Sequence, residues 1–388
     1  MKSNWKEERL GSLVRFSSGG TPNKNNPSYW NGTIPWISAK NMKSEVIETS
    51  DLSITEEGLI HGSKIAPKGS LLLLVRGSGL FNGIPVCYLE NAVAYNQDVK
   101  CIESTSELEN KYLFYWLKAN SGYLRKKIEF TSIGAGKFDT RFLSNLVVRF
   151  PDIVTRKKII DMADNISDRI NINKKINENL LQQAGAVFDK YYNTSSNQQL
   201  FTSLINVLGG GTPKTGNPYF WDGSIPFFTP KDVGAPYTFQ TEKYITESGL
   251  EHCNSRLYPK NTTFVTARGT VGKVSLAGTP MAMNQSCYAL ASETIDPLLV
   301  YFYALKAVAS LKHKASGAVF DAIVTRDFDT ETINILTDED ARSALSVIAP
   351  AMEAIHNNVE ENMRLSKLRD TLLPNLMSGK LDVSELDL

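Results

Sequence analysis

Cysteine and histidine are scarce in this sequence: its 388 residues include four of each. No C-x-x-C pair and no Cys/His pattern with zinc-ligand spacing occurs among the cysteines, which are Cys87, Cys101, Cys253 and Cys287. This absence argues against a disulfide framework and against a zinc site. We therefore expect the cysteines to be structural thiols.

Motifs for nucleotide binding and catalysis are also missing. The sequence has no G-x-x-x-x-G-K-[ST] loop, no well-matched G-x-G-x-x-G fingerprint and no His-Glu-x-x-His motif or triad-like grouping. Of the four histidines, His61 and His252 occupy matching places in the repeat described below, and we expect both rings to be buried hydrogen-bonding groups. We predict no catalytic residue, no cofactor site and no metal site, and hence a chain that is not an enzyme.

Long apolar runs and a charge excess are absent as well. The longest apolar run, 71–75, is far shorter than the roughly 20 residues that a membrane span needs, and the first residues resemble no secretory signal. We therefore expect a cytoplasmic protein. The formal net charge is +1, whereas a protein that binds DNA through charge alone is usually much more basic. Any nucleic-acid surface must then be local.

What the sequence does contain is a duplication. Segment 19–40 recurs as 210–231 at an offset of 191, with 11 of 22 positions identical, where composition alone would give roughly one or two. The similarity continues through 54–59 and 245–250 to Arg76-Gly77 and Arg268-Gly269. Asn96-Gln97 then matches Asn284-Gln285 after a slip of a few residues, as loop-length differences produce. A unit of this size is a duplicated domain.

The pattern predicts an α+β fold: two homologous α/β domains separated by two long helices. We divide the chain into a first domain (1–152), a central helix (153–195), a second domain (196–338) and a C-terminal helix (339–388). Within the first copy we expect a short helix at 7–14 and a helix at 107–127. Strands are expected around 36–38, 71–75, 86–89 and 99–102.

Two stretches, 155–192 and 340–373, have apolar residues at three-four spacing, which is typical of amphipathic helices of about 50 Å. Each stripe is narrow and includes a polar residue, Asn173 or Asn362, as in coiled coils. We predict an intramolecular antiparallel coiled coil, with Pro374 and Gly379 ending the second helix. The residues expected to pair the helices or to dock partners are Ile166, Ile170, Ile176, Leu180, Phe188, Ile348, Ile355, Val359 and Leu373.

Both copies place polar and basic residues in Gly-rich loops and at strand ends. Such loops let a backbone approach phosphate, an Arg at a strand end can reach guanine, and amides can read adenine. The candidates for DNA binding in the first copy are Thr21, Lys24, Asn25, Lys40, Asn41, Arg76, Ser78, Gln97 and Lys137. Those in the second copy are Thr212, Lys214, Thr215, Lys231, Arg268, Thr270, Gln285, Lys314 and Ser316.

Each group also has a structural interpretation. For the glycines, prolines and tryptophans of the Gly-Gly-Thr-Pro segments we favour a turn and a core anchor. For Lys24 and Lys214 the two interpretations are equally supported. The arginines would be structural if each paired with a carboxylate, amides in turns often serve local bonds, and the loops around Lys137 and Lys314 would otherwise be plain solvent loops.

The order of these parts resembles the specificity subunits of type I restriction-modification systems. The resemblance rests on the duplicated Gly-Gly-Thr-Pro, on Tyr29-Trp30 and Phe220-Trp221, on Ile-Pro before an aromatic residue, on the helix after each copy and on the closing Leu-Leu-Pro-x-Leu-Met-x-Gly-x-Leu. It covers essentially the whole chain.

The resemblance implies that each globular copy is a target recognition domain for half of a split site in double-stranded DNA. It further implies helices that dock two DNA methyltransferase subunits, and a complex that adds restriction and translocase subunits. S-adenosylmethionine, ATP and magnesium would belong to those partners. Because the copies differ at Asn23/Lys214, Asn25/Gly216 and Asn41/Asp232, the two half-sites should differ.

Two other classes of protein remain as alternatives. A fused methyltransferase or nuclease would need a cofactor or metal motif, and the sequence shows none. A coiled-coil adaptor or ligand-binding module without DNA would explain the helices and the low net charge. It would not explain the matching Gly and Lys loops of the two copies.

Overall fold

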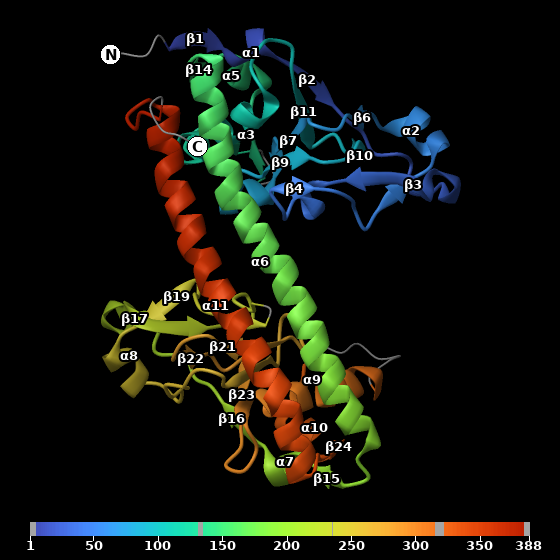
Figure 1. The fold of residues 1–388 in the computed structure, drawn as a ribbon, viewed down its shortest axis with the longest axis vertical. Helices are drawn as coiled ribbons and strands as arrows, with labels where there is room; N and C mark the ends of the chain where they lie inside the picture. The colour runs from blue at the N-terminus through green and yellow to red at the C-terminus, as the bar shows by residue number, and fades with distance from the viewer. Residues whose placement is uncertain (1–4, 131–134, 235, 315–321, 384–388) are drawn as a thin grey trace. The chain divides into compact units, whose positions relative to one another are not determined.

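The computed structural model describes residues 5–130, 135–234, 236–314 and 322–383. The chain forms two compact units: unit 1 comprises Met1–Asp168 with Leu365–Leu388, and unit 2 comprises Arg169–Arg364. Each unit contains one copy of the duplicated domain and a part of both long helices (Figure 1). Within the described residues, no helix is both long and apolar enough to span a membrane.

The core of unit 1 lies on a five-stranded sheet. Its strands, in spatial order, are β2 (Val14–Ser18), β11 (Val99–Ser104), β7 (Leu71–Leu74), β9 (Val86–Leu89) and β4 (Val46–Ile47). All four leucines of the central strand β7 are fully buried, because both faces of the sheet are covered. The helix α3 (Asn110–Ala119), which lies against β9, contributes six consecutive buried residues to this core (Figure 1).

Smaller elements complete unit 1. One sheet has the order β5 (Ser53–Ile54), β3 (Trp30–Ile37), β10 (Val93–Tyr95) and β6 (Ile65–Ala66); another has β12 (Glu129–Phe130), β13 (Gly136–Lys137) and β8 (Arg76–Gly77). A further pair joins β1 (Lys6–Arg9) to β14 (Val147–Phe150). The short helices are α1 (Leu10–Leu13), α2 (Glu56–Gly62), α4 (Ser121–Arg125) and α5 (Thr140–Ser144).

Unit 2 repeats this topology, which confirms the predicted pair of homologous domains. Its main sheet has the order β16 (Asn206–Gly209), β23 (Cys287–Ala291), β20 (Thr263–Thr266), β21 (Val274–Ala277) and β18 (Tyr237–Thr238). The others are β19 (Lys243–Ile245), β17 (Trp221–Phe228) and β22 (Ala282–Met283), and the pair of β15 (Gln198–Leu200) with β24 (Thr332–Asn334). The helices are α7 (Phe201–Leu204), α8 (Glu247–Glu251), α9 (Pro297–Lys314) and α10 (Thr325–Asp329).

Two local predictions in the first copy were only partly correct. The segment predicted as a helix at 7–14 is helical over 10–13 alone, because residues 7–9 belong to β1, which pairs in register with β14 more than 130 residues away. The helix predicted at 107–127 is shorter and is interrupted at Asn120, so that it forms α3 and α4. The predicted strands at 71–75, 86–89 and 99–102 are confirmed.

Two long helices follow the two copies, α6 (Ile153–Thr194) and α11 (Asp338–Met377). Their antiparallel pairing is confirmed within unit 2, since Asn173 Nδ2 donates to Asn362 Oδ1 at 3.0 Å and Asn358 Nδ2 to Asn177 Oδ1 at 2.8 Å. Residue numbers rise along α6 as they fall along α11 (Figure 1). The expected polar residues therefore lie inside this pair, where such groups fix the register.

The prediction that Pro374 ends the second helix was wrong. The helix α11 passes through Pro374 and ends at Met377, because Leu376 and Met377 are buried in the core of unit 1 and this burial offsets the one backbone bond lost at proline. Gly379, with φ of 71°, follows as predicted in the left-handed conformation that terminates helices.

The residues expected to pair the helices have different surroundings. Ile170, Phe188, Ile348, Ile355 and Leu373 are buried, whereas Ile166, Leu180 and Val359 are half-buried. Ile176 is 41% exposed, which leaves partner docking, and not helix pairing, as the expected role that its position allows. The neighbouring Asn177, which is buried, occupies the inward position one residue further along the helix.

Candidate nucleic-acid interface

The Gly-Gly-Thr-Pro segments of both copies pack backbone against backbone. A Cβ atom on Gly19 would lie 1.9 Å from the carbonyl oxygen of Tyr95, and one on Gly210 would lie 2.3 Å from that of Asn284. The indole Nε1 of Trp30 donates to the carbonyl of Asn23, and that of Trp221 donates to the carbonyl of Lys214. These contacts favour the structural interpretation of the glycines and tryptophans, which hold each loop in a fixed shape.

Gly19→Ala is expected to lower the free energy of unfolding by about 1–3 kcal/mol, because the new methyl group overlaps the Tyr95 backbone, which cannot move aside. Gly122→Ala is the control, since nothing lies within 4 Å of its Cβ position in α4 and alanine favours a helix by about 0.5–1 kcal/mol. Urea unfolding of the full chain measures both. Equal stability of the two variants would contradict the proposed close packing.

A threonine and a glutamine meet beside this loop in each copy. Thr21 Oγ1 donates to Gln97 Oε1 at 2.8 Å, and Thr212 makes the same bond to Gln285. Both glutamines are exposed, so their amide NH₂ groups face solvent with two N–H donors. The structure thus brings together two candidate residues from distant parts of each copy, and the glutamine amide is exposed at the equivalent position in both copies.

The two candidate arginines occupy equivalent positions. The backbone N–H of Arg76 donates to the carbonyl of Asp98, and that of Arg268 donates to the carbonyl of Ser286. Arg76 is in register with Lys137 on β13, and Arg268 forms a bridge with Ala322. Both side chains are exposed, and no salt bridge to a carboxylate involves either one within the described residues.

The residues after β3 and β17 form matching turns. Asn41 Oδ1 accepts from Ser38 Oγ at 2.8 Å, and Asp232 Oδ2 accepts from Thr229 Oγ1 at 2.6 Å. Asn41 therefore closes its own turn, and its availability to a base is reduced. Lys40 and Lys231, which precede these two residues, are exposed. Lys231 Nζ lies 3.6 Å from Glu242 Oε2.

Unit 2 has a hollow of about 360 Å³ at this place. It is lined by Thr229, Pro230, Lys231, Glu242, Lys243, Gly269 and Asn284. These residues come from the loops after β17, β20 and β22 and from the start of β19, so the hollow gathers three of the loops that the sequence singled out. Thr270 Oγ1 donates to the Pro230 carbonyl at 3.0 Å and joins two of these loops. Lys243 was missed, because the first copy has no lysine at its place.

The remaining candidates are spread over the surface. Lys24, Asn25, Lys214 and Thr215 are exposed on loops, Ser78 is exposed at the start of the 3-10 helix Ser78–Asn82, and Lys137 is half-buried on β13. Lys314 forms an ion pair with Glu331, which is 1% exposed, and this favours a structural role for Lys314. Ser316 lies outside the described residues. His61 and His252 are exposed and stack on Tyr29 and Phe220, so the prediction of buried rings was wrong.

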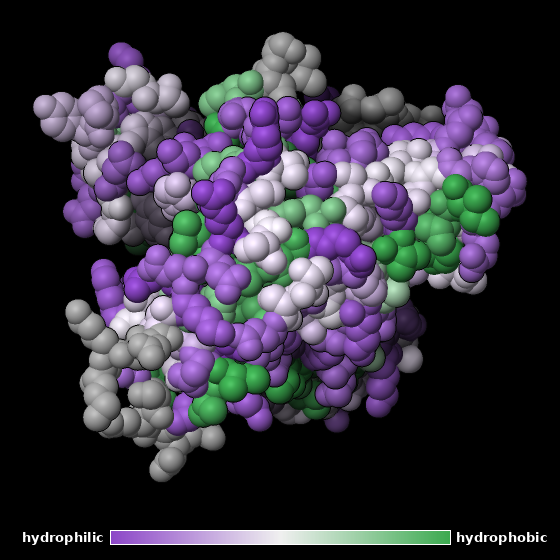
Figure 2. Space-filling model, turned by 90° about the horizontal axis from the view of Figure 1, so that it is seen from above, coloured by the Kyte–Doolittle hydropathy of each residue, from purple (hydrophilic) through white to green (hydrophobic). Residues whose placement is uncertain are grey.

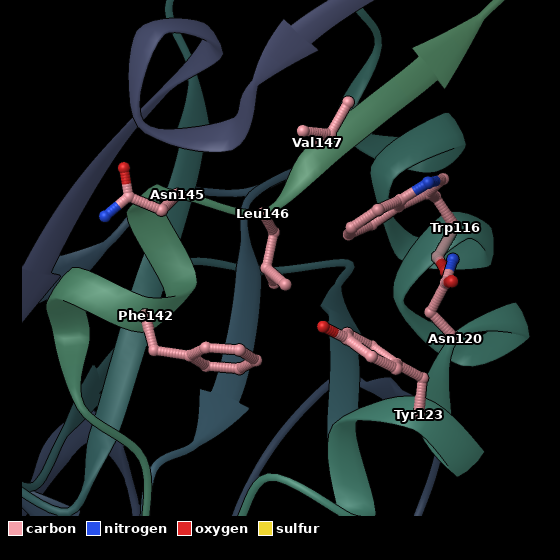
Figure 3. Close-up of a pocket in the computed structure, with 7 residues that line it drawn as sticks. All are labelled: Trp116, Asn120, Tyr123, Phe142, Asn145, Leu146 and Val147. Carbon is pink, nitrogen blue, oxygen red and sulfur yellow. The ribbon is translucent and has the colours of Figure 1, made fainter.

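A second hollow, of about 330 Å³, lies in unit 1 between α3, α4, α5 and β14. The rings of Trp116, Tyr123 and Phe142 surround it together with Leu146 (Figure 3). The amide groups of Asn120 and Asn145 donate to backbone carbonyls of their own helical turns. No charged residue lines this hollow, so it suits an apolar group and does not suit phosphate.

In the part of the chain that the structure describes, the cysteine thiols and the potential metal ligands give little support for a catalytic role. Burial raises the pKa of the Cys87 and Cys287 thiols to about 12, so both stay protonated and unreactive at neutral pH. Among the described residues, no group of histidine, cysteine and acidic side chains is placed to hold a metal ion.

The face drawn in Figure 2 is mostly hydrophilic, with apolar residues in separate small areas.

Two copies of one α+β module, each presenting cationic and amide side chains on equivalent loops, define a binding protein with two similar but unequal sites. The family model for the type I restriction modification DNA specificity domain matches residues 2–182 and 193–344. The chain therefore belongs to this family, that of the specificity subunits of type I restriction-modification systems.

Individual relatives agree with this assignment. The chain is 23% identical to the type I restriction enzyme MjaIX specificity subunit of Methanocaldococcus jannaschii, over 99% of this chain and 95% of that protein. It is 29% identical to the EcoR124I/EcoR124II specificity subunit of Escherichia coli, over 43% of this chain and 41% of that protein. Its fold resembles the crystal structure of an S subunit from M. genitalium, with a TM-score of 0.57, 14% identity and coverage of 97% of this chain and 96% of that one.

Proposed function

We propose that each copy reads one half of a bipartite, asymmetric DNA sequence for a type I restriction-modification complex. The observation that carries this proposal is the same loop framework in both copies with different side chains on it. The Thr–Gln pairs and the two arginines recur, as do the capped turns that end in Asn41 and Asp232. Two equivalent loop frameworks that carry different side chains suit the recognition of two different half-sites on one duplex.

The long helices are proposed to dock DNA methyltransferase subunits. Apolar residues are exposed along both helices, namely Ile172 and Ile176 on α6 and Val347 and Leu368 on α11. Ile172 and Ile176 lie one helical turn apart, and adjoining exposed apolar side chains mark surfaces that a partner covers. Two methyltransferase subunits are proposed because the domain is duplicated. Restriction and translocase subunits would join them, and S-adenosylmethionine, ATP and magnesium would be held by these partners.

Selection of duplexes from a random library by the complex of this chain with its methyltransferase subunits tests the proposal. We expect the bound pool to contain two short, different sequences at a fixed separation. Binding should weaken steeply as salt rises, because cationic side chains displace counterions from phosphate. An adaptor without DNA affinity would leave the library unenriched, and that outcome would rule the proposal out.

A further inference from the structure

An exposed aromatic pair stands beside Arg76 in unit 1. Phe130 of β12 is 76% exposed, although a phenyl ring in water forgoes the free energy of burial. One face of its ring stacks on Phe81, with centroids 5.3 Å apart and an angle of 20° between the ring planes. The other parts of the ring are left to solvent, and neither phenylalanine has a role in the site described above.

The small sheet β12–β13–β8 places this pair opposite the cationic residues. Phe130 is in register with Gly136, and Gly136 with Gly77, so no side chain from the neighbouring strands covers the phenyl ring. Glu129, Lys137 and Arg76 form the adjacent row. Since successive residues of a strand point to opposite faces, the sheet carries its aromatic ring on one face and this row of one acidic and two basic side chains on the other.

The stretch of sequence around Phe130 is rich in basic residues. Between residues 125 and 141 there are five basic side chains, Arg125, Lys126, Lys127, Lys137 and Arg141, and two acidic ones, Glu129 and Asp139. Arg125 Nη2 donates to the carbonyl oxygen of Phe81 at 2.7 Å and so ties the turn that carries Phe81 to α4. An aromatic pair near basic residues suits DNA, which has negative phosphates and stacked bases, better than it suits an apolar protein surface.

Phe81 belongs to a segment that only the first copy has. The offset between the copies falls from 192 at Arg76/Arg268 to 188 at Val86/Val274, so the first copy has four more residues in between. These residues build the short 3-10 helix Ser78–Asn82, and in the described part of unit 2 a turn from Arg268 to Val274 takes its place. The aromatic pair therefore distinguishes the first copy from the second.

We infer that Phe130, supported by Phe81, stacks on a base of the half-site read by the first copy and opens a base step there. The inference rests on the proposed function and deepens it. Apolar side chains of DNA-binding proteins enter base steps in this way, and such a step carries specificity because its cost depends on the sequence being opened. Arg76, on the opposite face of the sheet, keeps the base-reading role proposed for it, and Lys137 beside it contacts the DNA backbone while the ring enters.

Fluorescence of 2-aminopurine, placed in turn at each position of the half-site, measures this opening in the complex with methyltransferase subunits. In the wild-type complex we expect a severalfold rise at one position. Phe130→Ala should abolish the rise and weaken binding roughly tenfold, in the range of base–aromatic stacking. Ile60→Ala is the matched control, because Ile60 of α2 is 77% exposed in the same unit, and it should leave both readouts unchanged.

Phe130→Leu separates stacking from folding. Leucine still covers Phe81, so its unfolding temperature should match the wild type, whereas the fluorescence rise should fall sharply. The inference would be overturned if Phe130→Ala kept the full fluorescence rise and the full affinity for DNA. It would also be overturned if Phe130→Ala lost binding to the methyltransferase subunits in the absence of DNA, because Phe130 would then be a protein contact. The inference is also overturned if the wild-type complex binds DNA but 2-aminopurine fluorescence rises at no position of the half-site. Failure of the wild-type complex to bind DNA at all would instead refute the proposed function.

Discussion

Arg76→Ala is expected to relax recognition of one half-site while the other half-site stays fully specified. The Arg76 side chain is exposed, and its position is fixed by a backbone bond to Asp98 and by the register with Lys137. An arginine in this setting can bond both guanine O6 and N7, and such a pair discriminates against the wrong base by about 1–3 kcal/mol. We expect discrimination at one or two base pairs to fall by roughly ten- to a hundredfold.

The two copies supply the control for this experiment. Arg268→Ala should affect the other half-site only, and Arg342→Ala, an exposed arginine on α11, should affect neither. Competition binding with duplexes that vary one half-site at a time measures each effect. A uniform loss for all sequences with a shallower salt dependence would make these arginines phosphate contacts. If specificity did not change in either variant, the reading role of both would be abandoned.

Phe188→Ala is expected to lower the stability of unit 2 by about 3–5 kcal/mol, because the cavity it leaves would be lined by large rings that cannot close it. Phe188 of α6 is fully buried and contacts Phe302 and Tyr303 of α9 at centroid distances of 5.3 and 5.1 Å. This side chain thus anchors the long helix to the second domain. Differential scanning calorimetry of the full chain measures the loss.

Ile176→Ala is the matched control on the same helix. Its side chain is 41% exposed, so its removal should cost well under 1 kcal/mol, in line with other surface substitutions. If Ile176→Ala destabilised the chain as much as Phe188→Ala, the helix would present a different face to its neighbours from the one described. The same variant also tests assembly with methyltransferase subunits, since Ile176 is one of the exposed apolar residues on the helices.

Sequence periodicity and internal repetition predicted much of the fold. The repeat foretold two domains of one topology, and the heptad-like spacing foretold two long antiparallel helices. Periodicity did not resolve neighbouring positions on one helix: Ile176, expected to pair the helices or to dock a partner, is 41% exposed, and its neighbour Asn177 is buried. The strand β1 was missed because its partner β14 is distant in the sequence and the pairing depends on backbone bonds.

The candidate site was predictable in its framework and less so in its contacts. The repeat identified Gln97 and Gln285, and their bonds to Thr21 and Thr212 bring each candidate pair together. Residue type alone could not show that Asn41 closes its own turn. The pair of Phe81 and Phe130 was not found either, because the two residues lie 49 positions apart and meet through a sheet of two-residue strands.

Sequencing of methylated genomic DNA from cells that express this chain with its methyltransferase subunits tests the central claim most directly. We predict one methylated motif made of two different short sequences with a fixed gap. Replacing the first domain by that of a relative should change one of these sequences and keep the other. A continuous palindromic motif, or a methylation pattern that does not depend on this chain, would contradict the account of two unequal reading domains.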